Sequence, residues 1–260
     1  MNIFTSSYHN HTVRCHHARG TDEEYIKAAI EGGFKIFGFS DHAPHYYPDG
    51  YVSSVRMTVD EMPEYASSVK ALRVKYKDYI DIKLGVEMEY FPGYFVRDLA
   101  LYRSLGVDYI LLGQHTFGNE GIGRWENSFE KSDDAGRLSA YVDQCIEAME
   151  TGVISAVVHP DVINFSGDLD VARSEYDRFI LAAKRLDVPF EINLLGLSEG
   201  RHYPNRTFWE RVAKNSHVAV VGRDAHSPDR VAKKSETEMV LRFADEIGVE
   251  LINDVRLGRI

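Results

Sequence analysis

Residues 21–42 read TDEEYIKAAIEGGFKIFGFSDH, and they form one complete helix-to-strand unit. A threonine followed three residues later by a glutamate is a capping box that begins a helix over 21–30, and two glycines end that helix. The apolar and aromatic run 36–40 then predicts a buried strand. The strand is followed by Asp41 and His42, whose side chains can both titrate and bind metal ions. The segment therefore predicts a helix followed by a buried strand, with candidate metal-binding residues at the end of that strand.

The same alternation of helices and strands runs through the chain. Further short runs of β-branched and aromatic residues predict strands at 3–8, 82–88, 108–113, 153–158, 188–192 and 218–221. Segments with helical periodicity predict helices at 58–76, 94–104, 137–150, 171–185, 206–214 and 235–247. Alternation favours a parallel sheet, either open and doubly wound or closed into a barrel. Seven strands are one fewer than a (β/α)8 barrel has, so we expect an α/β fold built as a distorted (β/α)7 barrel similar to a TIM barrel.

The composition is that of a single globular domain. The chain has 260 residues, of which 44% are hydrophobic and 27% charged, and no Pro-, Gly- or Ser-rich linker divides it. We therefore expect one domain over residues 1–260. The formal net charge of -10 argues against a nucleic acid as the main ligand, because binding to a phosphate backbone needs clustered Lys and Arg. A small anionic ligand is compatible with this charge, since a bound cation reverses the local field.

The cysteines and the apolar runs indicate the compartment. Cys15 and Cys145 are far apart and form no C-x-x-C motif, so we expect neither a disulfide framework nor a thiolate zinc site. The first residues, MNIFTSSYHNHT, lack the basic and apolar regions of a signal peptide, and apolar runs such as 153–158 are too short to cross a bilayer. We therefore expect a cytoplasmic protein that has no membrane partner. The sequence leaves its oligomeric state open.

Every predicted strand is followed by residues that bind metals or protons. In either α/β architecture, ligands bind at the carboxyl ends of parallel strands. In chain order, the residues at those ends are His9, His11, Asp41, His42, Glu87, Glu89, Gln114, His115, His159, Asp161, Asn193, Asp224 and His226. Side chains two positions apart on a strand point the same way, so His9 and His11 can bind one ion together. The pattern predicts one metal site at the C-terminal ends of the strands.

The ligand types indicate the chemistry of this site. Imidazole and carboxylate suit zinc, iron or manganese, and the lack of thiolates disfavours a purely structural zinc. Divalent ions held in this way lower the pKa of a bound water, produce a hydroxide nucleophile at neutral pH, and bind the oxygens of an anionic electrophile. Phosphate esters fit well, because positive ions offset the charge on the phosphoryl oxygens. The sequence therefore predicts a metal-dependent hydrolase that acts on a small-molecule phosphate ester.

Two arginines and two aspartates are candidates for roles beside the metals. Arg201 and Arg223 lie in loops at the predicted rim and could bind phosphate bidentately, with a surface or ion-pair role as the alternative for each. Asp161 or Asp41 could protonate the departing alkoxide. Either aspartate could instead orient a histidine that binds metal.

The other histidines have simpler interpretations. His16 and His17 are adjacent in the loop after the first strand and point in different directions, so we expect at most one of them to bind metal. His45 could line the pocket or face solvent, and His202 is in a loop where a solvated side chain is expected. His217 precedes a strand at its amino end, which is the wrong rim for the site, so we expect a structural role.

These residues resemble the motifs of the polymerase and histidinol phosphatase (PHP) superfamily, and in particular its histidinol-phosphatase branch. The matching segments are His9-x-His11-Thr12, Cys15-His-His17, Ser40-Asp-His-Ala-Pro44, Gly85-Val-Glu87, Gly113-Gln-His115, His159-Pro-Asp161 and Gly222-Arg-Asp-Ala-His-Ser-Pro228. They occur in the family order across nearly the whole chain. The resemblance implies a distorted (β/α)7 barrel that holds three divalent ions.

The resemblance also implies which residues bind each ion. One ion would take His9, His11, Glu87 and Asp224; a second would share Glu87 and take His115 and His159; the third would take His17, His42 and His226. In the family pattern the loop histidine comes two residues after the cysteine, which favours His17 over His16 as the ligand. The last motif often carries serine where this chain has Arg223.

The reaction implied by the resemblance is hydrolysis of L-histidinol phosphate to L-histidinol and phosphate, a step of histidine biosynthesis, through a metal-activated hydroxide. Glu120, Glu199 or Asp49 could pair with the histidinol ammonium, or each could be a solvated charge. The alternatives are another phosphoesterase of the superfamily, such as a phosphotyrosine-protein phosphatase or a nucleotide phosphodiesterase. A C–N hydrolase and a non-catalytic metal-binding module are the rivals from other classes.

Overall fold

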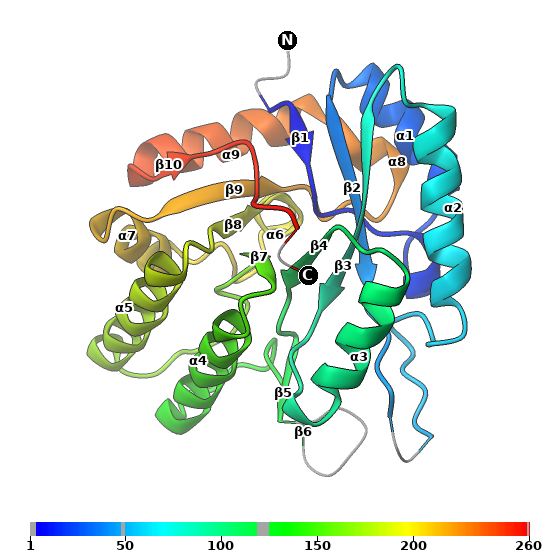
Figure 1. Ribbon diagram of the computed structural model, residues 1–260. Helices are drawn as coiled ribbons and strands as arrows, with labels where there is room; N and C mark the ends of the chain where they lie inside the picture. Colours follow the sequence, from blue (N-terminus) through cyan, green and yellow to red (C-terminus); the bar gives the residue numbers. More distant parts are fainter. Residues whose placement is uncertain (1–3, 48–49, 119–124, 259) are drawn as a thin grey trace.

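A curved parallel sheet forms the centre of the molecule (Figure 1). The computed structural model describes residues 4–47, 50–118, 125–258 and 260. Within these residues the sheet has eight strands, which neighbour one another in chain order: β1 (Ser6–Ser7), β2 (Ile36–His42), β3 (Asp81–Met88), β4 (Tyr109–Leu112), β7 (Ile154–Val157), β8 (Phe190–Asn193), β9 (Val218–Gly222) and β10 (Glu250–Leu251). All pairs are parallel, and the sheet curls into a half-barrel surrounded by helices. The predicted α/β barrel-like fold is confirmed.

The strand count differs from the prediction in two places. The seven predicted strands correspond to β1 to β4 and β7 to β9, and β10 is an eighth, two-residue strand that pairs with β9. A separate antiparallel hairpin, β5 (Thr116–Gly118) with β6 (Trp125–Asn127), was also not predicted. Such short strands give too few residues for a period of two to be recognised. The first strand is limited to Ser6–Ser7 instead of 3–8, of which residue 3 lies outside the described residues.

The two edges of the sheet approach each other at Asn253, just after β10. The Asn253 side-chain oxygen accepts a hydrogen bond from the Thr5 N–H at 3.4 Å, and its carbonyl accepts one from the Ser6 hydroxyl. No strand ladder joins β1 to β10 among the described residues. Side-chain and loop contacts therefore replace a ladder at this point, and the barrel is distorted there.

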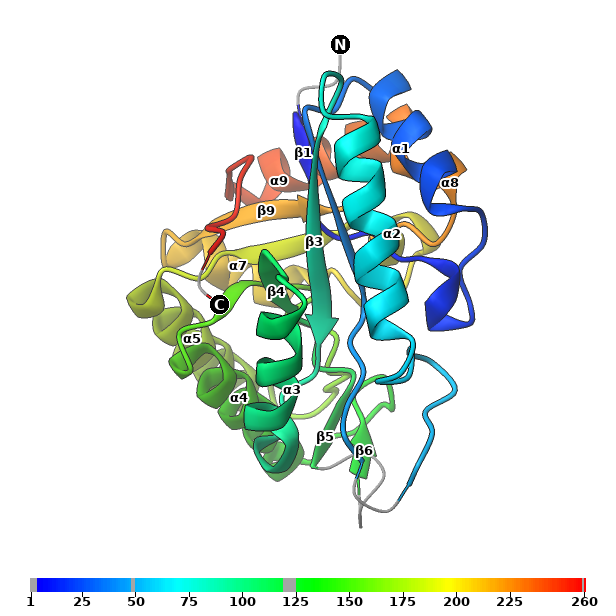
Figure 2. The same ribbon diagram turned by 45° about the vertical axis from the view of Figure 1, so that its right-hand side comes forward.

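Helices cover the outer face of the sheet (Figures 1 and 2). They are α1 (Asp22–Glu31), α2 (Met62–Lys75), α3 (Pro92–Ser104), α4 (Ala135–Glu150), α5 (Leu169–Leu186), α6 (Leu194–Glu199), α7 (Arg206–Lys214), α8 (Pro228–Val231) and α9 (Lys234–Ile247), with a short 3-10 turn at Val13–Cys15. All seven predicted helices are present, and the short helices α6 and α8 were not predicted. None of the described helices is long and apolar enough to span a membrane.

Two Thr-x-x-Glu segments at the starts of predicted helices, Thr21 to Glu24 and Thr58 to Glu61, have different outcomes. At α1 the box forms as predicted, with Thr21 and Glu24 each accepting a hydrogen bond from the other's backbone N–H. At α2, Glu61 accepts a hydrogen bond from the Thr58 N–H at 2.7 Å, yet the helix begins only at Met62. The same local interaction thus closes a turn before α2 instead of beginning the helix at residue 58.

The inside of the half-barrel is filled by Tyr109. This side chain is fully buried in a small apolar cluster with Tyr8 and Leu111, and its hydroxyl lies 2.6 Å from the Tyr8 carbonyl oxygen and 2.9 Å from that of Phe39. The interior is therefore a packed core and not a channel. Polar side chains gather beyond it, where the strands end.

His217 is buried against the larger hydrophobic core, which contains Val188 and Phe190, and this agrees with the structural role that the sequence predicted. Its Nε2 donates to the Val188 carbonyl at 3.0 Å, and its ring meets Phe190 edge-on. Burial lowers the pKa of His217 to about 4. An unfolded chain binds a proton here near pH 6.5, so the folded state loses relative stability as the pH falls from about 6.5 to about 4.

We predict that replacing His217 with Gln removes this part of the pH dependence. Glutamine still offers an N–H to Val188 but does not titrate. The stability advantage of the wild type over His217→Gln should therefore shrink by up to about 3 kcal/mol between pH 7 and pH 4. Urea unfolding of both proteins across this pH range measures the difference. An advantage that stays constant would show that His217 does not titrate differently on folding.

Candidate metal centre

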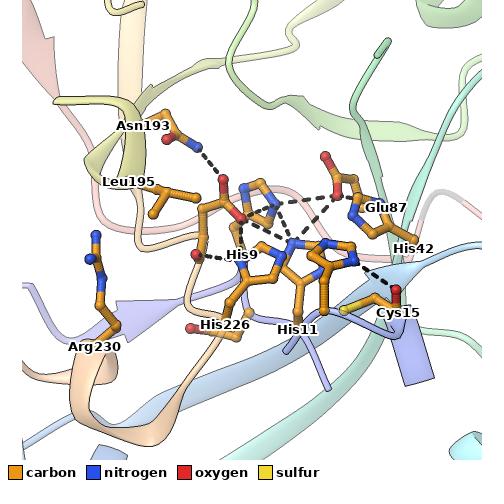
Figure 3. A network of polar contacts seen from close by, with 12 residues as sticks. His9, His11, Cys15, His42, Glu87, Asn193, Leu195, His226 and Arg230 are labelled. Carbon is orange, nitrogen blue, oxygen red and sulfur yellow. Dashed lines mark hydrogen bonds and ion pairs between the residues drawn. The ribbon is translucent and has the colours of Figure 1, made fainter. Parts of the chain in front are cut away.

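Glu87, near the carboxyl end of β3, is surrounded by imidazoles (Figure 3). Its side chain is only 1% exposed. Five histidines have a ring nitrogen 2.9 to 3.5 Å from a Glu87 carboxylate oxygen: His9, His11, His42, His115 and His159. The nearest is His159 Nε2 at 2.9 Å, followed by His42 Nδ1 at 3.0 Å. The carboxylate is thus shared by the ends of several strands.

His9, His11 and Asp224 form a compact group beside Glu87. The Nε2 atoms of the two histidines are 3.2 Å apart, and that of His11 is 3.1 Å from Asp224 Oδ1. The loops that carry them are joined by a hydrogen bond of 3.0 Å from the His11 N–H to the Ala225 carbonyl. The ends of β1 and β9 therefore converge on one point, although they are more than 200 residues apart.

His17, His42 and His226 form a second group at the mouth of the site. The ring centroid of His17 lies 5.4 Å from that of His42 and 4.7 Å from that of His226. The Nδ1 of His17 contacts the Cys15 carbonyl at 2.7 Å, and the Nδ1 of His226 contacts the Asp224 carbonyl at 3.0 Å. Donation from Nδ1 leaves the Nε2 lone pair of each ring available to a metal.

The backbone is strained where it delivers two of these side chains. Asp224 has φ of 48° and His159 has φ of 32°, both in the left-handed region that residues other than glycine rarely adopt. Such conformations persist only where the surrounding structure imposes them, and they concentrate at functional sites. Here the turn directs each side chain inward at the end of its strand.

The unpaired atoms of the cluster fit bound cations. Glu87 Oε2 and His226 Nε2 are buried, and neither forms a hydrogen bond of good geometry with a described residue, although His42 Nδ1 lies 3.0 Å from Glu87 Oε2. The close approach of the His9 and His11 Nε2 atoms brings two potential lone pairs face to face. Buried polar groups are normally satisfied, so the exceptions need an explanation. Oxygen and imidazole nitrogen donors that point at a common centre fit divalent metal ions.

The pKa shifts favour ionised carboxylates in the cluster and neutral imidazoles at His42 and His226, which are the forms that bind metal ions. Burial raises the pKa of Glu87 and Asp224, but the surrounding histidines outweigh it and hold both values well below the usual range. Burial lowers the pKa of His42 to about 4 and, together with the charge of His11, lowers that of His226 to about 3. For His11, burial is outweighed by Asp224 and Asp41, which raise its pKa to about 9. A cation would displace that proton.

Three further carboxylates orient the histidines from outside the cluster. Glu191 Oε2 lies 2.8 Å from the Nδ1 of His9, and Glu89 Oε1 lies 3.2 Å from the Nδ1 of His115. Asp41 Oδ1 is 3.4 Å from the Nδ1 of His11. A carboxylate that accepts the Nδ1 proton fixes the tautomer in which Nε2 faces inward.

Two motif glycines make room for these carboxylates. A Cβ at Gly113 would lie 2.0 Å from Glu87 Oε1, and a Cβ at Gly222 would lie 1.8 Å from Glu191 Oε2. Any side chain at either position would therefore displace a buried acid. The glycines in Gly113-Gln-His115 and in the segment beginning at Gly222 serve the site through this close approach.

The two aspartates that were candidates for the proton donor, Asp41 and Asp161, do not line the pocket. Asp41 is fully buried, and burial, which raises its pKa, is outweighed by His11, so that the pKa is lowered. It accepts hydrogen bonds from the Thr12 hydroxyl and the His42 N–H, so it orients the site and is not positioned to give up a proton. Of the two roles considered for Asp41, the contacts favour orientation of His11.

Asp161 lies behind the pocket wall. Burial raises the pKa of Asp161 to about 7, and its Oδ2 accepts hydrogen bonds from the Asn205 N–H and from the Trp209 indole at 3.1 Å. Neither Asp161 nor Asp41 is among the residues that line the pocket above the cluster. The contacts of Asp161 stabilise the loop before α7 instead.

A pocket of about 520 Å³ opens above the histidines and contains Arg201. Its lining combines cluster residues with loop residues: His17, His42, Tyr51, Ser53, Ser54, Val55, Arg56, Glu87, Glu89, His115, Thr116, Asn127, Phe129, Leu195, Glu199, Arg201, Tyr203, Asp224 and His226. This volume is typical of small-molecule sites. The predicted rim position of Arg201 therefore agrees with the structure.

The other arginine, Arg223, points away from the pocket. Its guanidinium donates to the Thr237 hydroxyl at 2.8 Å and lies over the ring of Phe34. The residue is 2% exposed and does not line the pocket, so the expected phosphate contact is not supported. On strand β9 and in the turn after it, alternate side chains face opposite sides, and Asp224 takes the inward position. Arg223 consequently packs beneath α9.

Residues near the cluster that do not join it have other partners. His16 is exposed and lies outside both histidine groups, whereas His45 is buried against Asp98, with Nδ1 to Oδ2 at 2.6 Å. His202 donates to a backbone carbonyl at 2.7 Å. Cys15 is closer to the cluster, because its Sγ lies within 4.8 Å of ligand atoms of His11 and His226, and burial raises the pKa of its thiol to about 12. Of the acids considered for the histidinol ammonium, Glu199 pairs with Arg201, while Asp49 and Glu120 lie outside the described residues.

The comparison with protein families agrees with this geometry. A model described as PHP domain matches residues 7–194, which is most of the chain. The chain belongs to the PHP domain family. Two relatives bear the name "Probable histidinol-phosphatase". The one from Deinococcus radiodurans is 29% identical over 256 residues, covering 95% of this chain and 92% of that protein. The one from Schizosaccharomyces pombe is 24% identical over 276 residues, covering 97% and 90%.

Solved structures show the same fold. A histidinol phosphate phosphatase from Lactococcus lactis, whose structure is of a complex with zinc, L-histidinol and phosphate, is similar to this PHP domain with a TM-score of 0.73 and 17% identity. The similarity covers 97% of this chain and 98% of that one. At this identity the similarity establishes the architecture. The arrangement of the site in this PHP domain comes from its own residues.

Several residues of the PHP domain's site were not assigned roles from the sequence. Glu191 is buried beside His9, Arg56 is buried beside Glu89, and Phe129 and Tyr203 line the pocket. A glutamate within the apolar run 188–192 is a signal that could have identified Glu191, because an acid buried on a strand needs a partner. The contributions of Arg56 and Phe129 depend on loop paths, for which the sequence carries no comparable signal.

We predict that Glu191→Gln weakens metal binding by this PHP domain about 10- to 100-fold, because the amide can no longer stabilise the Nδ1–H of His9 through its charge. Metal titration of the purified protein followed by calorimetry measures the effect. Glu210→Gln, an exposed acid that pairs with Arg206, is the matched control and should bind metal normally. Wild-type affinity in Glu191→Gln would show that this carboxylate does not tune the site.

Proposed function

We propose that this PHP domain is a metal-dependent phosphomonoesterase that hydrolyses L-histidinol phosphate to L-histidinol and phosphate. The proposal is carried by one observation: imidazoles and carboxylates from six strand ends converge beneath a single pocket that also presents an arginine. The names of the two relatives and the ligands in the Lactococcus lactis complex support the choice of substrate.

We further propose that the cluster binds three divalent ions. The first would be held by His9, His11, Glu87 and Asp224, the second by Glu87, His115 and His159, and the third by His17, His42 and His226. Ligand atoms that lie within 4.8 Å of one another support this assignment: His9, His11 and Asp224 form one group, His9, Glu87 and His159 form another that shares His9, and His17, His42 and His226 form a third. His115 joins the second ion through its Nε2, which lies 3.5 Å from Glu87 Oε1. Zinc, iron and manganese all suit these donors.

Ions bound there would supply Lewis acidity towards phosphoryl oxygens and lower the pKa of water. The chain's own residues then have three tasks. Glu191, Glu89 and Asp41 keep the imidazole lone pairs directed inward. Arg201, at the opposite wall, binds the non-bridging phosphate oxygens and is always protonated. The walls formed by Phe129 and Tyr203 offer aromatic surface to the ring of the substrate.

The experiment that tests the function is a phosphate-release panel with metal-loaded protein. We expect kcat/KM for histidinol phosphate to exceed that for phosphotyrosine, an aryl phosphate, nucleotide monophosphates and a phosphodiester. A value no higher than that for the aryl phosphate would overturn the substrate assignment. Absence of phosphate release from every ester, with metal bound, would overturn the phosphatase itself, and turnover of amides would favour a C–N hydrolase.

We predict that Glu87→Gln lowers kcat at least about 1000-fold and reduces the amount of bound metal, because the substitution removes the charge that two of the proposed ions share. Metal analysis and single-turnover phosphate release check both parts. Glu130→Gln changes an exposed acid outside the cluster and should leave both unchanged. Normal turnover and full metal content in Glu87→Gln would refute the assignment.

A different outcome is expected for Arg201→Ala. Loss of a charged bidentate donor should raise KM for histidinol phosphate about 10- to 100-fold. The metal content should stay unchanged, since the hydrogen bonds of Arg201 to described residues go to Glu199 and Tyr203 and not to a cluster histidine. A fall in kcat in addition would show that the contact tightens in the transition state. If kcat/KM does not change, Arg201 does not bind the substrate.

A further inference from the structure

Arg201 is held in place by two neighbours before any substrate binds. Its Nε and Nη2 donate to the same oxygen of Glu199, at 3.0 and 2.7 Å, and its Nη1 donates to the Tyr203 hydroxyl at 2.8 Å. These contacts use three of the five N–H groups of the guanidinium. One N–H on each of the two terminal nitrogens is left by the contacts with described residues, which is the number that bidentate phosphate binding needs.

The partner of Arg201 is itself shared with a second arginine. Arg230 is on α8, just after the motif that runs from Gly222 to Pro228. Its Nη1 lies 3.6 Å from Glu199 Oε1. Its Nη2 donates to the Ser198 hydroxyl at 2.8 Å, so it contacts the end of α6 twice. Figure 3 shows Arg230 on the same side of the histidine cluster as Leu195, which is also on α6. Glu199 is therefore held from two sides.

A buried acid fixes Arg230 in turn. Glu236 on α9 is 1% exposed, and its Oε1 lies 3.2 Å from Arg230 Nη2 and 3.2 Å from Lys233 Nζ. The Arg230 side chain is only 20% exposed, so solvent screens its charge less than that of a surface arginine. The result is a continuous chain of charges from the core to the pocket wall, which consists of Glu236, Arg230, Glu199 and Arg201.

The charges next to Arg201 affect how well an anion can bind there. Arg201 and Glu199 alone form a neutral pair, and a phosphate that approaches Arg201 would also face the negative charge of Glu199. Arg230 adds a positive charge next to the same carboxylate, so two arginines share Glu199, while Glu236 pairs with Arg230 at the end of the chain that is farther from Arg201. Charge networks of this kind have larger effects than isolated surface ion pairs.

We propose that Arg230 is a positioning residue for phosphate recognition. It holds Glu199, which holds Arg201 in the orientation that presents its remaining N–H groups to the pocket, and it offsets the charge of Glu199. This inference rests on the proposed phosphatase function. A merely structural role, as a clamp between α6, α8 and α9, would affect stability without a selective effect on phosphate affinity.

The test compares Arg230→Met, Arg230→Lys and Lys233→Met as full-length, metal-loaded proteins. For Arg230→Met we expect KM for histidinol phosphate and the inhibition constant of inorganic phosphate to rise together about 10-fold, with kcat within about twofold and metal content unchanged. Arg230→Lys keeps the charge but not the two-sided contact, so it should recover part of the affinity. Lys233→Met also removes a partner of Glu236 but none of Glu199, so it should keep the wild-type constants.

Coupling to Arg201 gives a second, independent readout. Because Arg230 acts in part by positioning Arg201, Arg201→Ala combined with Arg230→Met should weaken phosphate binding by less than the sum of the two single losses. Unchanged KM and unchanged phosphate inhibition in Arg230→Met, or an equal loss in Lys233→Met, would overturn the inference. Calorimetric binding of inorganic phosphate separates the two proposals, because it tests Arg230 even if the wild type hydrolyses no ester.

Discussion

The burial of Glu87 among five imidazoles is the interaction on which the rest of this structure depends. One carboxylate can be shared by residues at or after the ends of β1, β2, β4 and β7 only if the sheet curls until its strand ends converge. The convergence also requires an open position beside the carboxylate, which Gly113 provides. The barrel-like curvature, the motif glycine and the histidines are thus parts of one constraint.

Such a concentration of polar groups opposes folding unless it is compensated. Burying a charge or an unpaired donor costs several kcal/mol, on the order of what a whole domain retains as stability. The PHP domain compensates with Glu191, Glu89 and Asp41, which contact the outer nitrogens of the histidines, while the inner nitrogens face one another. Cations at the inner nitrogens would complete this compensation, so metal binding and folding are thermodynamically linked in such a site.

The pocket divides into two sides that are built by different means. The metal side consists of residues at strand ends, where the backbone is rigid and the relative positions follow from sheet geometry. The opposite side consists of Arg201 and Tyr203, which follow the short helix α6, and of the loop before α2. The charge network through Arg230 and Glu236 gives that side, which has no strand to support it, a connection to the core.

The sequence by itself determined the order of helices and strands, the PHP family and the set of metal-binding candidates. The signals behind the elements and the candidates are local. Periodicity indicates that one face is buried, and a His or Asp at the end of a strand indicates a position at the rim. The sequence also favoured His17 over His16 as a metal ligand and predicted a structural role for His217. Tertiary structure alone decided that Arg223 faces α9, that Asp41 and Asp161 orient other groups, that Glu191 supports His9, and that β10 extends the sheet. These features depend on which side chains meet across distant segments, and a residue's own neighbours in sequence carry no information about that.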